Sequence, residues 1–179
     1  MDKAQEVTEH LLARGLKARQ RQRGRLIILR WACAIAALGL IYWAISPFAS
    51  FALNATDSID GTLFYVVKGQ FPQHGEIAAF HPPKGNLYPD EMWFGKYIVG
   101  YPGDVVTIVN RSFYINGRFI GTAKEYSTTG KKMEMSSAGV ISAKHYFMWT
   151  AHENSYDSRY NDINWIPESS IFGRVTRIF

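Results

Sequence analysis

The chain has 179 residues, of which 47% are hydrophobic and 15% aromatic, and this composition excludes a disordered protein. Its net charge of +5 comes from residues 1–30, because the remaining 149 residues carry 12 basic and 12 acidic side chains. A neutral body lacks the clustered basic surface of nucleic-acid-binding proteins. The single cysteine, Cys33, excludes an intramolecular disulfide and any multi-cysteine metal site.

The first predicted elements are a basic tail over residues 1–25 and a transmembrane helix over residues 26–48. Residues 26–45 are apolar apart from Arg30, and a helix of this length extends about 30 Å, which matches the hydrocarbon core of a bilayer. A buried core helix would keep a polar stripe, and a cleaved secretory leader has a shorter apolar core. We therefore predict an uncleaved anchor. Its basic flank puts the N-terminus in the cytoplasm and the rest of the chain in the periplasm of a bacterium.

Beyond the span, short runs of β-branched and aromatic residues alternate with turn signals. The runs cover residues 62–67, 76–80, 96–100, 104–109, 112–115, 118–121, 145–151 and 171–178. Asn116-Gly117 predicts a hairpin with a type I′ turn, because both central positions of that turn require positive φ. No segment after Ile45 has sustained helical periodicity, so we predict a mainly β domain, a barrel or sandwich, over residues 54–179. Within it, the polar residues 124–144 are predicted to form a variable lobe.

Lys96 is the first residue whose position suggests chemistry. It lies between residues 92–94 and 97–99, in one of the most apolar stretches of the predicted β domain. Burial disfavours the ammonium form of a lysine, and a neutral lysine amine can act as a general base toward a serine hydroxyl. The alternative is an ordinary lysine on an edge strand, whose charged end reaches solvent.

The segment KYIVGYPGD, residues 96–104, resembles the K-R-V-V-G-x-P-G-D segment of type I signal peptidases. The matching positions are Lys96, Val99, Gly100, Pro102, Gly103 and Asp104. Three further segments resemble that family in the same order along the chain, namely GEIAAFHPP (75–83), NSYDSRY (154–160) and WIPESSIFGRV (165–175). The small size and the Thr-x-Ser opening are more similar to the conjugative-transfer branch, whose members mature pilin subunits. The resemblance implies a signal-peptidase-like β domain over nearly the whole body.

The resemblance also implies catalytic roles for particular residues. Ser58 matches the nucleophile and Lys96 the general base. Thr56 matches the position whose hydroxyl forms the oxyanion hole together with the backbone N–H of the nucleophile. The chain departs from the family at Gly61, where a proline is usual, and glycine makes a less rigid turn than proline.

The segment around residues 154–160 supplies three more matches. Ser155 matches the serine that orients the lysine, and Asp157 with Arg159 matches a structural ion pair. The G-D-N-R sequence that commonly opens this segment is replaced by residues 149–152, so contacts made through that motif are not carried over.

Together these inferences predict a membrane-anchored serine endopeptidase that removes leader peptides from membrane-tethered precursors. The expected partners are a pilin-like precursor, the lipid bilayer and the apparatus of conjugative transfer, and the expected location is the bacterial inner membrane with a single span. Two alternatives remain open: a pilin cyclase, in which an amine attacks the acyl-enzyme, and a non-catalytic assembly module. No cofactor and no metal is expected, because the five histidines include no pair at i, i+4.

Overall fold

The computed structural model describes residues 2–56 and 58–179, with side chains described from residue 24 onwards. The side chains of most of the predicted basic tail therefore lie outside the described residues. The chain divides into a helical unit that ends at Ser46 and a β unit that runs from Pro47 to Phe179.

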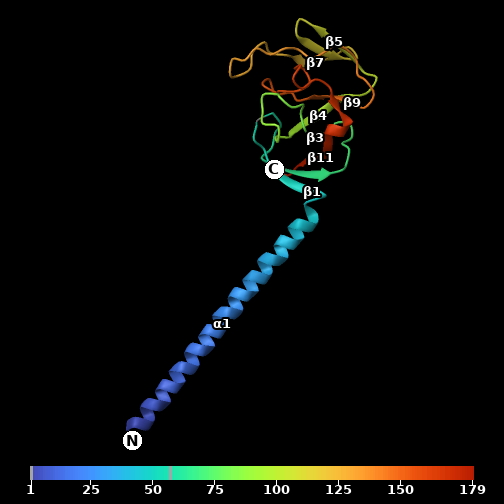
Figure 1. Cartoon of the computed structure of the whole chain (residues 1–179). Coiled ribbons are helices and arrows are strands. Elements are labelled where there is room, and N and C mark those ends of the chain that lie inside the picture. Colours follow the sequence, from blue (N-terminus) through green and yellow to red (C-terminus); the bar gives the residue numbers. More distant parts are fainter. Residues whose placement is uncertain (1, 57) are drawn as a thin grey trace. The chain divides into compact units, whose positions relative to one another are not determined.

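The helical unit is the single long helix α1 (Asp2–Ile45) (Figure 1). Its segment Gly24–Ile45 has a mean hydropathy of 1.9 and is long enough to cross a bilayer. The apolar side chains of this segment are exposed, among them Ile28, Leu38 and Trp43, so the described part of the chain provides no core for them. This distribution is typical of a helix whose side chains contact lipid, and it fits a membrane-anchored protein.

The helix ends earlier than the predicted span. We predicted a transmembrane helix over residues 26–48, whereas α1 ends at Ile45. Ser46 closes the last turn, its backbone N–H donating to the carbonyl of Tyr42 at 2.8 Å. Because Ser46 precedes Pro47, helical backbone is disfavoured there, which is the physical reason for the earlier end.

The β unit contains two antiparallel sheets. The seven-stranded sheet has the order β1-β2-β11-β3-β4-β9-β10, and the four-stranded sheet has the order β7-β6-β5-β8. The strands of the first sheet are β1 (Ala49–Leu53), β2 (Leu63–Lys68), β3 (Ile77–Phe80), β4 (Phe94–Gly100), β9 (His145–Trp149), β10 (Ile166–Pro167) and β11 (Ile171–Arg177). Those of the second are β5 (Val105–Val109), β6 (Ser112–Ile115), β7 (Arg118–Thr122) and β8 (Gly139–Val140). A single 3₁₀ turn, η1 (Glu168–Ser170), precedes β11, and the predicted mainly β fold class is confirmed.

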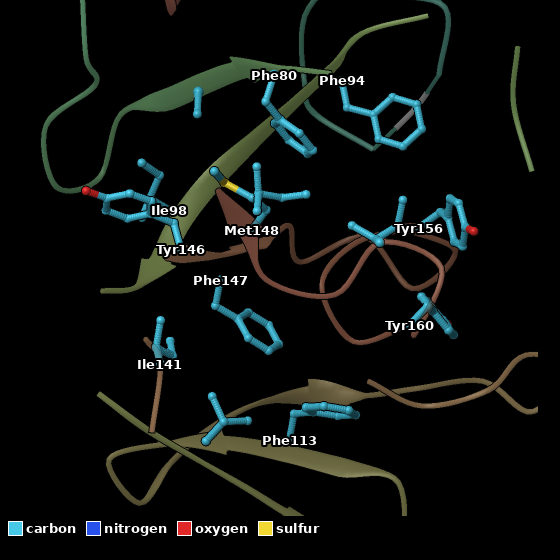
Figure 2. Close-up of a cluster of buried hydrophobic side chains, with 14 of the residues drawn as sticks. Phe80, Phe94, Ile98, Phe113, Ile141, Tyr146, Phe147, Met148, Tyr156 and Tyr160 are labelled. Atoms are coloured by element: carbon cyan, nitrogen blue, oxygen red, sulfur yellow. The ribbon is translucent and has the colours of Figure 1, made fainter. Parts of the chain in front are cut away.

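The main core lies between the two sheets, as Figure 2 shows. Phe113 of β6 packs against Phe147 of β9 with their ring centroids 5.9 Å apart, and Ile98 of β4 belongs to the same cluster. A second, smaller cluster contains Phe64 of β2 and Val175 of β11. Because successive side chains of a strand point to opposite faces, β3 contributes to both clusters, and all four of its residues are buried. The middle of the large sheet is thus covered on both faces.

The eight predicted runs correspond to β2 to β7, β9 and β11. The predicted hairpin is confirmed, with φ of 50° at Asn116 and 79° at Gly117. Strand β1 was not predicted, because its five residues follow the predicted span at once and continue its apolar character; it pairs with β2 along its whole length. Residues 124–144, predicted as a variable lobe, include the buried residues Met133 and Ile141, and β8 within them pairs with β5. These residues show little hydrophobic periodicity because their backbone is mostly irregular, although some of their side chains are buried in the β unit.

Candidate active site

Lys96 lies in the middle of β4 and points into the protein. Alternate residues of this strand are buried, and Lys96 falls on the same face as Phe94 and Ile98. Its partner across the ladder is Ala78 of β3, whose small side chain leaves room for the long one. Only 5% of Lys96 is exposed, so the alternative of a surface lysine on an edge strand is excluded.

Burial lowers the pKa of Lys96 from 10.5 to about 8. The charge of Asp157 opposes this shift and that of Arg159 adds to it, but loss of hydration is the largest cause. A lysine with this pKa is neutral in about a tenth of molecules at pH 7, compared with fewer than about one in a thousand for an exposed lysine. The structure therefore provides an amine that can accept a proton near neutral pH.

The amine of Lys96 is held by Ser155. Nζ donates to Ser155 Oγ at 3.0 Å, and Ser155 is itself 1% exposed. In the neutral amine, one N–H makes this bond while the lone pair remains free for a proton. The structure thus brings Ser155 into contact with the amine, and its orienting role stays a prediction.

Asp157 and Arg159 form a buried, bidentate ion pair. Arg159 Nε lies 2.8 Å from Asp157 Oδ1, and Arg159 Nη2 lies 3.0 Å from Asp157 Oδ2. The guanidinium also donates to the carbonyls of Ser155 at 3.2 Å and Thr122 at 3.0 Å. Ser158, between the two charged residues, exchanges hydrogen bonds with the backbone of β9. The loop that carries Ser155 is therefore fixed from several sides.

Ser58 lies in the loop between β1 and β2. Its Oγ is 3.0 Å from Thr56 Oγ1, so the two hydroxyls predicted to serve the same reaction are in contact. The Asn54 side chain spans this loop: Nδ2 donates to the carbonyls of Ile59 at 2.7 Å and Gly61 at 2.8 Å, and Oδ1 accepts the N–H of Thr56. Sequence analysis missed Asn54. The signal that could have found it is the tendency of asparagine to bond nearby backbone groups in turns.

Gly61, which stands where the family usually has proline, is fixed by the end of the chain. Its φ of 127° is disfavoured for other residues, and a Cβ here would lie 2.6 Å from Arg177 Cδ and 2.9 Å from the carbonyl oxygen of Phe179. That same carbonyl accepts the N–H of Thr62 at 2.6 Å. The close approach of the C-terminal segment therefore requires a glycine at this position, a constraint that the sequence did not indicate.

A cleft of about 760 Å³ contains Ser58, Thr56 and Lys96. Much of its remaining wall is apolar, with Leu53 and Trp93 among the lining residues. No hydrogen bond directly joins the described side chains of Ser58 and Lys96, since the hydroxyl is bonded to Thr56 and the amine to Ser155. The structure therefore brings the two groups to the wall of one cleft without a direct bond between them.

A serine and a desolvated lysine in one cleft are the elements of a hydrolase that uses an amine as its base. The family model described as signal peptidase, peptidase S26, matches residues 23–179. The chain therefore belongs to this signal peptidase family, a family of serine peptidases, and the resemblance to type I signal peptidases is confirmed.

Two relatives illustrate the match. A probable signal peptidase I-2 from Synechocystis sp. is 29% identical over 107 residues, which cover 58% of this chain and 46% of that relative. The chain thus spans less than half the length of this curated relative. A crystal structure of a signal peptidase I from Enterococcus faecalis V583 is 22% identical, with 60% of this chain and 98% of that chain covered and a TM-score of 0.39.

Proposed function

We propose that this protein is a membrane-anchored serine endopeptidase in which Ser58 is the nucleophile and Lys96 the general base. The observation that carries the proposal is the buried amine of Lys96, bonded to Ser155 within the cleft that also contains Ser58. Burial lowers the pKa of this lysine to about 8, which suits a base that works near neutral pH.

The reaction divides into acylation and deacylation. Neutral Lys96 takes the proton of Ser58 while Oγ bonds to the carbonyl carbon of the scissile peptide. The resulting ammonium then gives that proton to the departing amine, which leaves an acyl-enzyme. Lys96 then takes a proton from water as the water oxygen attacks the ester carbon, the ester C–O bond breaks to release the new carboxyl end of the peptide, and the ammonium of Lys96 returns its proton to Ser58 Oγ. Each step returns Lys96 to its starting form.

Thr56 and Ser155 assist these steps from opposite sides. The Thr56 hydroxyl touches Ser58 Oγ in the free protein, and we propose that it turns to the carbonyl oxygen when negative charge develops there. The backbone N–H of Ser58 is the second proposed donor. Ser155 keeps one N–H of the lysine occupied, so that the lone pair points into the cleft.

The proposed substrates are membrane-tethered precursors bound as extended strands. The cleft wall includes Leu53 at the end of β1 and is apolar in much of its extent, which suits apolar side chains of a bound extended peptide. The likeness to the conjugative-transfer branch suggests a pilin-like precursor. The apolar segment of α1 supports an inner-membrane anchor, with a cytoplasmic N-terminus and a periplasmic body as its proposed orientation.

Co-expression with candidate pilin precursors, read by intact mass, tests the proposal. The wild-type chain is expected to shorten its precursor, and Ser58→Ala and Lys96→Ala are expected to leave it uncut. The exposed residues Ser169 and Lys132 provide matched controls, since Ser169→Ala and Lys132→Ala remove the same chemical groups elsewhere. Full cleavage by either site variant would contradict the dyad. Loss of one further water mass from the product would instead indicate cyclisation.

A further inference from the structure

The loop that carries Ser58 has little packing of its own. Between β1 and β2, Thr56 and Asp60 are exposed, and Ile59 is the residue that packs against the smaller core cluster. A nucleophile must be held within a fraction of an ångström of its productive position, and a 1 Å displacement can lower the rate about 100-fold. Interactions other than hydrophobic packing must therefore hold this loop in one conformation.

The side chain of Asn54 provides these interactions through its hydrogen bonds. Both hydrogens of Nδ2 are used, one toward the carbonyl of Ile59 and one toward the carbonyl of Gly61, at 2.7 and 2.8 Å. On the other side, Oδ1 accepts the N–H of Thr56 at 3.3 Å. The backbone N–H of Asn54 also donates to the carbonyl of Thr62 at 2.9 Å, which closes the base of the loop.

These bonds lie on both sides of Ser58 in the sequence. One precedes it, at Thr56, and two follow it, at Ile59 and Gly61, so a single side chain connects the two arms of the loop. The geometry needs an acceptor and two donors on a short stem. Aspartate has no donor, serine is too short to reach both arms, and glutamine adds a methylene that shifts every bond.

We propose that Asn54 is a positioning residue that sets the place of Ser58 Oγ, and with it the contact between Ser58 and Thr56. This inference rests on the proposed role of Ser58 as the nucleophile. Asn54 acts through the loop backbone and not by touching the reacting atoms, so its loss should change the chemical step more than substrate binding.

Asn54→Asp in the full chain, studied in detergent with a cleavable precursor, provides the test. The substitution keeps the shape but replaces two donors by an oxygen that faces two carbonyls. The expected result is a fall of about 100-fold in kcat with KM changed less than about twofold, because the misplaced nucleophile still lies in an intact cleft. The acid limb of the pH profile should keep its apparent pKa in Asn54→Ala, because that variant, unlike Asn54→Asp, adds no charge to the cleft that contains Lys96.

Asn116→Asp is the matched control. Asn116 also bonds with both ends of its side chain, Nδ2 to Asp104 at 2.7 Å and Oδ1 from the N–H of Val105 at 2.9 Å, but it lies in the hairpin turn between β6 and β7. This variant should lower the melting temperature and leave kcat unchanged. Hydrogen exchange should be faster over residues 55–62 in Asn54→Asp and unchanged there in Asn116→Asp. If Asn54→Asp does not fold, Asn54→Ala carries the same comparison.

Three results would overturn the positioning role: kcat of the Asn54 variant within about twofold of wild type, an equal loss in the Asn116 control, or a loss confined to KM, which would make Asn54 a substrate contact. If the wild-type chain cleaves no precursor, the proposed function fails. Hydrogen exchange then tests by itself whether Asn54 holds the loop of Ser58 in place. Faster exchange over residues 55–62 supports the role, and unchanged exchange contradicts it.

Discussion

The two loops that supply the site are built in different ways. The loop around Ser155, Asp157 and Arg159 is buried, with exposed fractions of 1%, 0% and 3%, and an ion pair and the backbone of β9 hold it. The loop around Ser58 is partly exposed and is held by Asn54 and by the end of the chain. The proposed base is thus fixed by the core, and the proposed nucleophile by a few hydrogen bonds.

This difference follows from what each group must do. A lysine works as a base only while it is kept from water, so its surroundings must be closed before substrate arrives. A nucleophile must meet an incoming peptide, so its loop has to lie at the open side of the cleft. Substitutions near Lys96 should therefore alter stability and proton affinity, whereas substitutions near Ser58 should alter mainly the rate of the chemical step.

The largest expected effect belongs to Lys96→Met. Methionine fills a similar space without the amine, so kcat/KM should fall by about 10³- to 10⁴-fold. The free energy of unfolding below pH 8 should not fall with it, because the wild-type protein carries a poorly hydrated ammonium that the variant lacks. Urea unfolding at pH 7 and a cleavage assay on the same samples measure both quantities. If Lys96→Met were inactive because it does not fold, the predicted loss of activity without loss of stability would be wrong.

Asp157→Asn should have the next largest effect, and it should act on stability. The substitution leaves the buried guanidinium of Arg159 without its carboxylate, which typically costs about 3–5 kcal/mol. The midpoint of urea unfolding measures the loss. Glu76→Gln offers a control, since it breaks the partly exposed pair with Arg174 and should lower the unfolding midpoint much less. Equal losses in the two variants would show that burial of the pair is unimportant.

The buried half of the site was predictable because its sequence pattern is local. Lys96 lies within a continuous apolar strand, and the spacing of Ser155, Asp157 and Arg159 repeats a recognisable segment. Most strands were predicted for the same reason, since alternating apolar runs between turns have few alternative structures.

The exposed half was less predictable because its contacts join distant parts of the chain. Asn54 bonds to groups five and seven residues away, and the backbone of Phe179 reaches Gly61 and Thr62 from the far end of the sequence. Strand β1 was missed because its five residues gain their structure from pairing with β2. Such contacts depend on the folded sheet and leave no periodic signal.

Gly61→Ala should have a moderate effect, and it tests whether the end of the chain supports the loop of Ser58. The added Cβ would meet Arg177 and the carbonyl of Phe179, and the required φ is unfavourable for alanine, so about 1–3 kcal/mol of strain is expected. Gly61→Pro should be worse, although proline is usual in the family, because proline fixes φ near −65°. Cleavage rates and melting temperatures measure both. Gly103, also at positive φ but with open space around it, offers the control Gly103→Ala.

The smallest expected effect is on pH dependence. If Lys96 is the base, as proposed, it must be neutral to act, so kcat/KM should rise with pH and level off above about 8, the pKa of Lys96 in the free protein. The free energy of unfolding should also rise between about pH 8 and 10.5, because there the unfolded chain binds the lysine proton that the folded chain has released. Asp157 raises the pKa of Lys96, so in Asp157→Asn the acid limb should move to lower pH when measured in samples shown to be folded. A shift to higher pH would mean that the carboxylate of Asp157 does not favour the protonated amine.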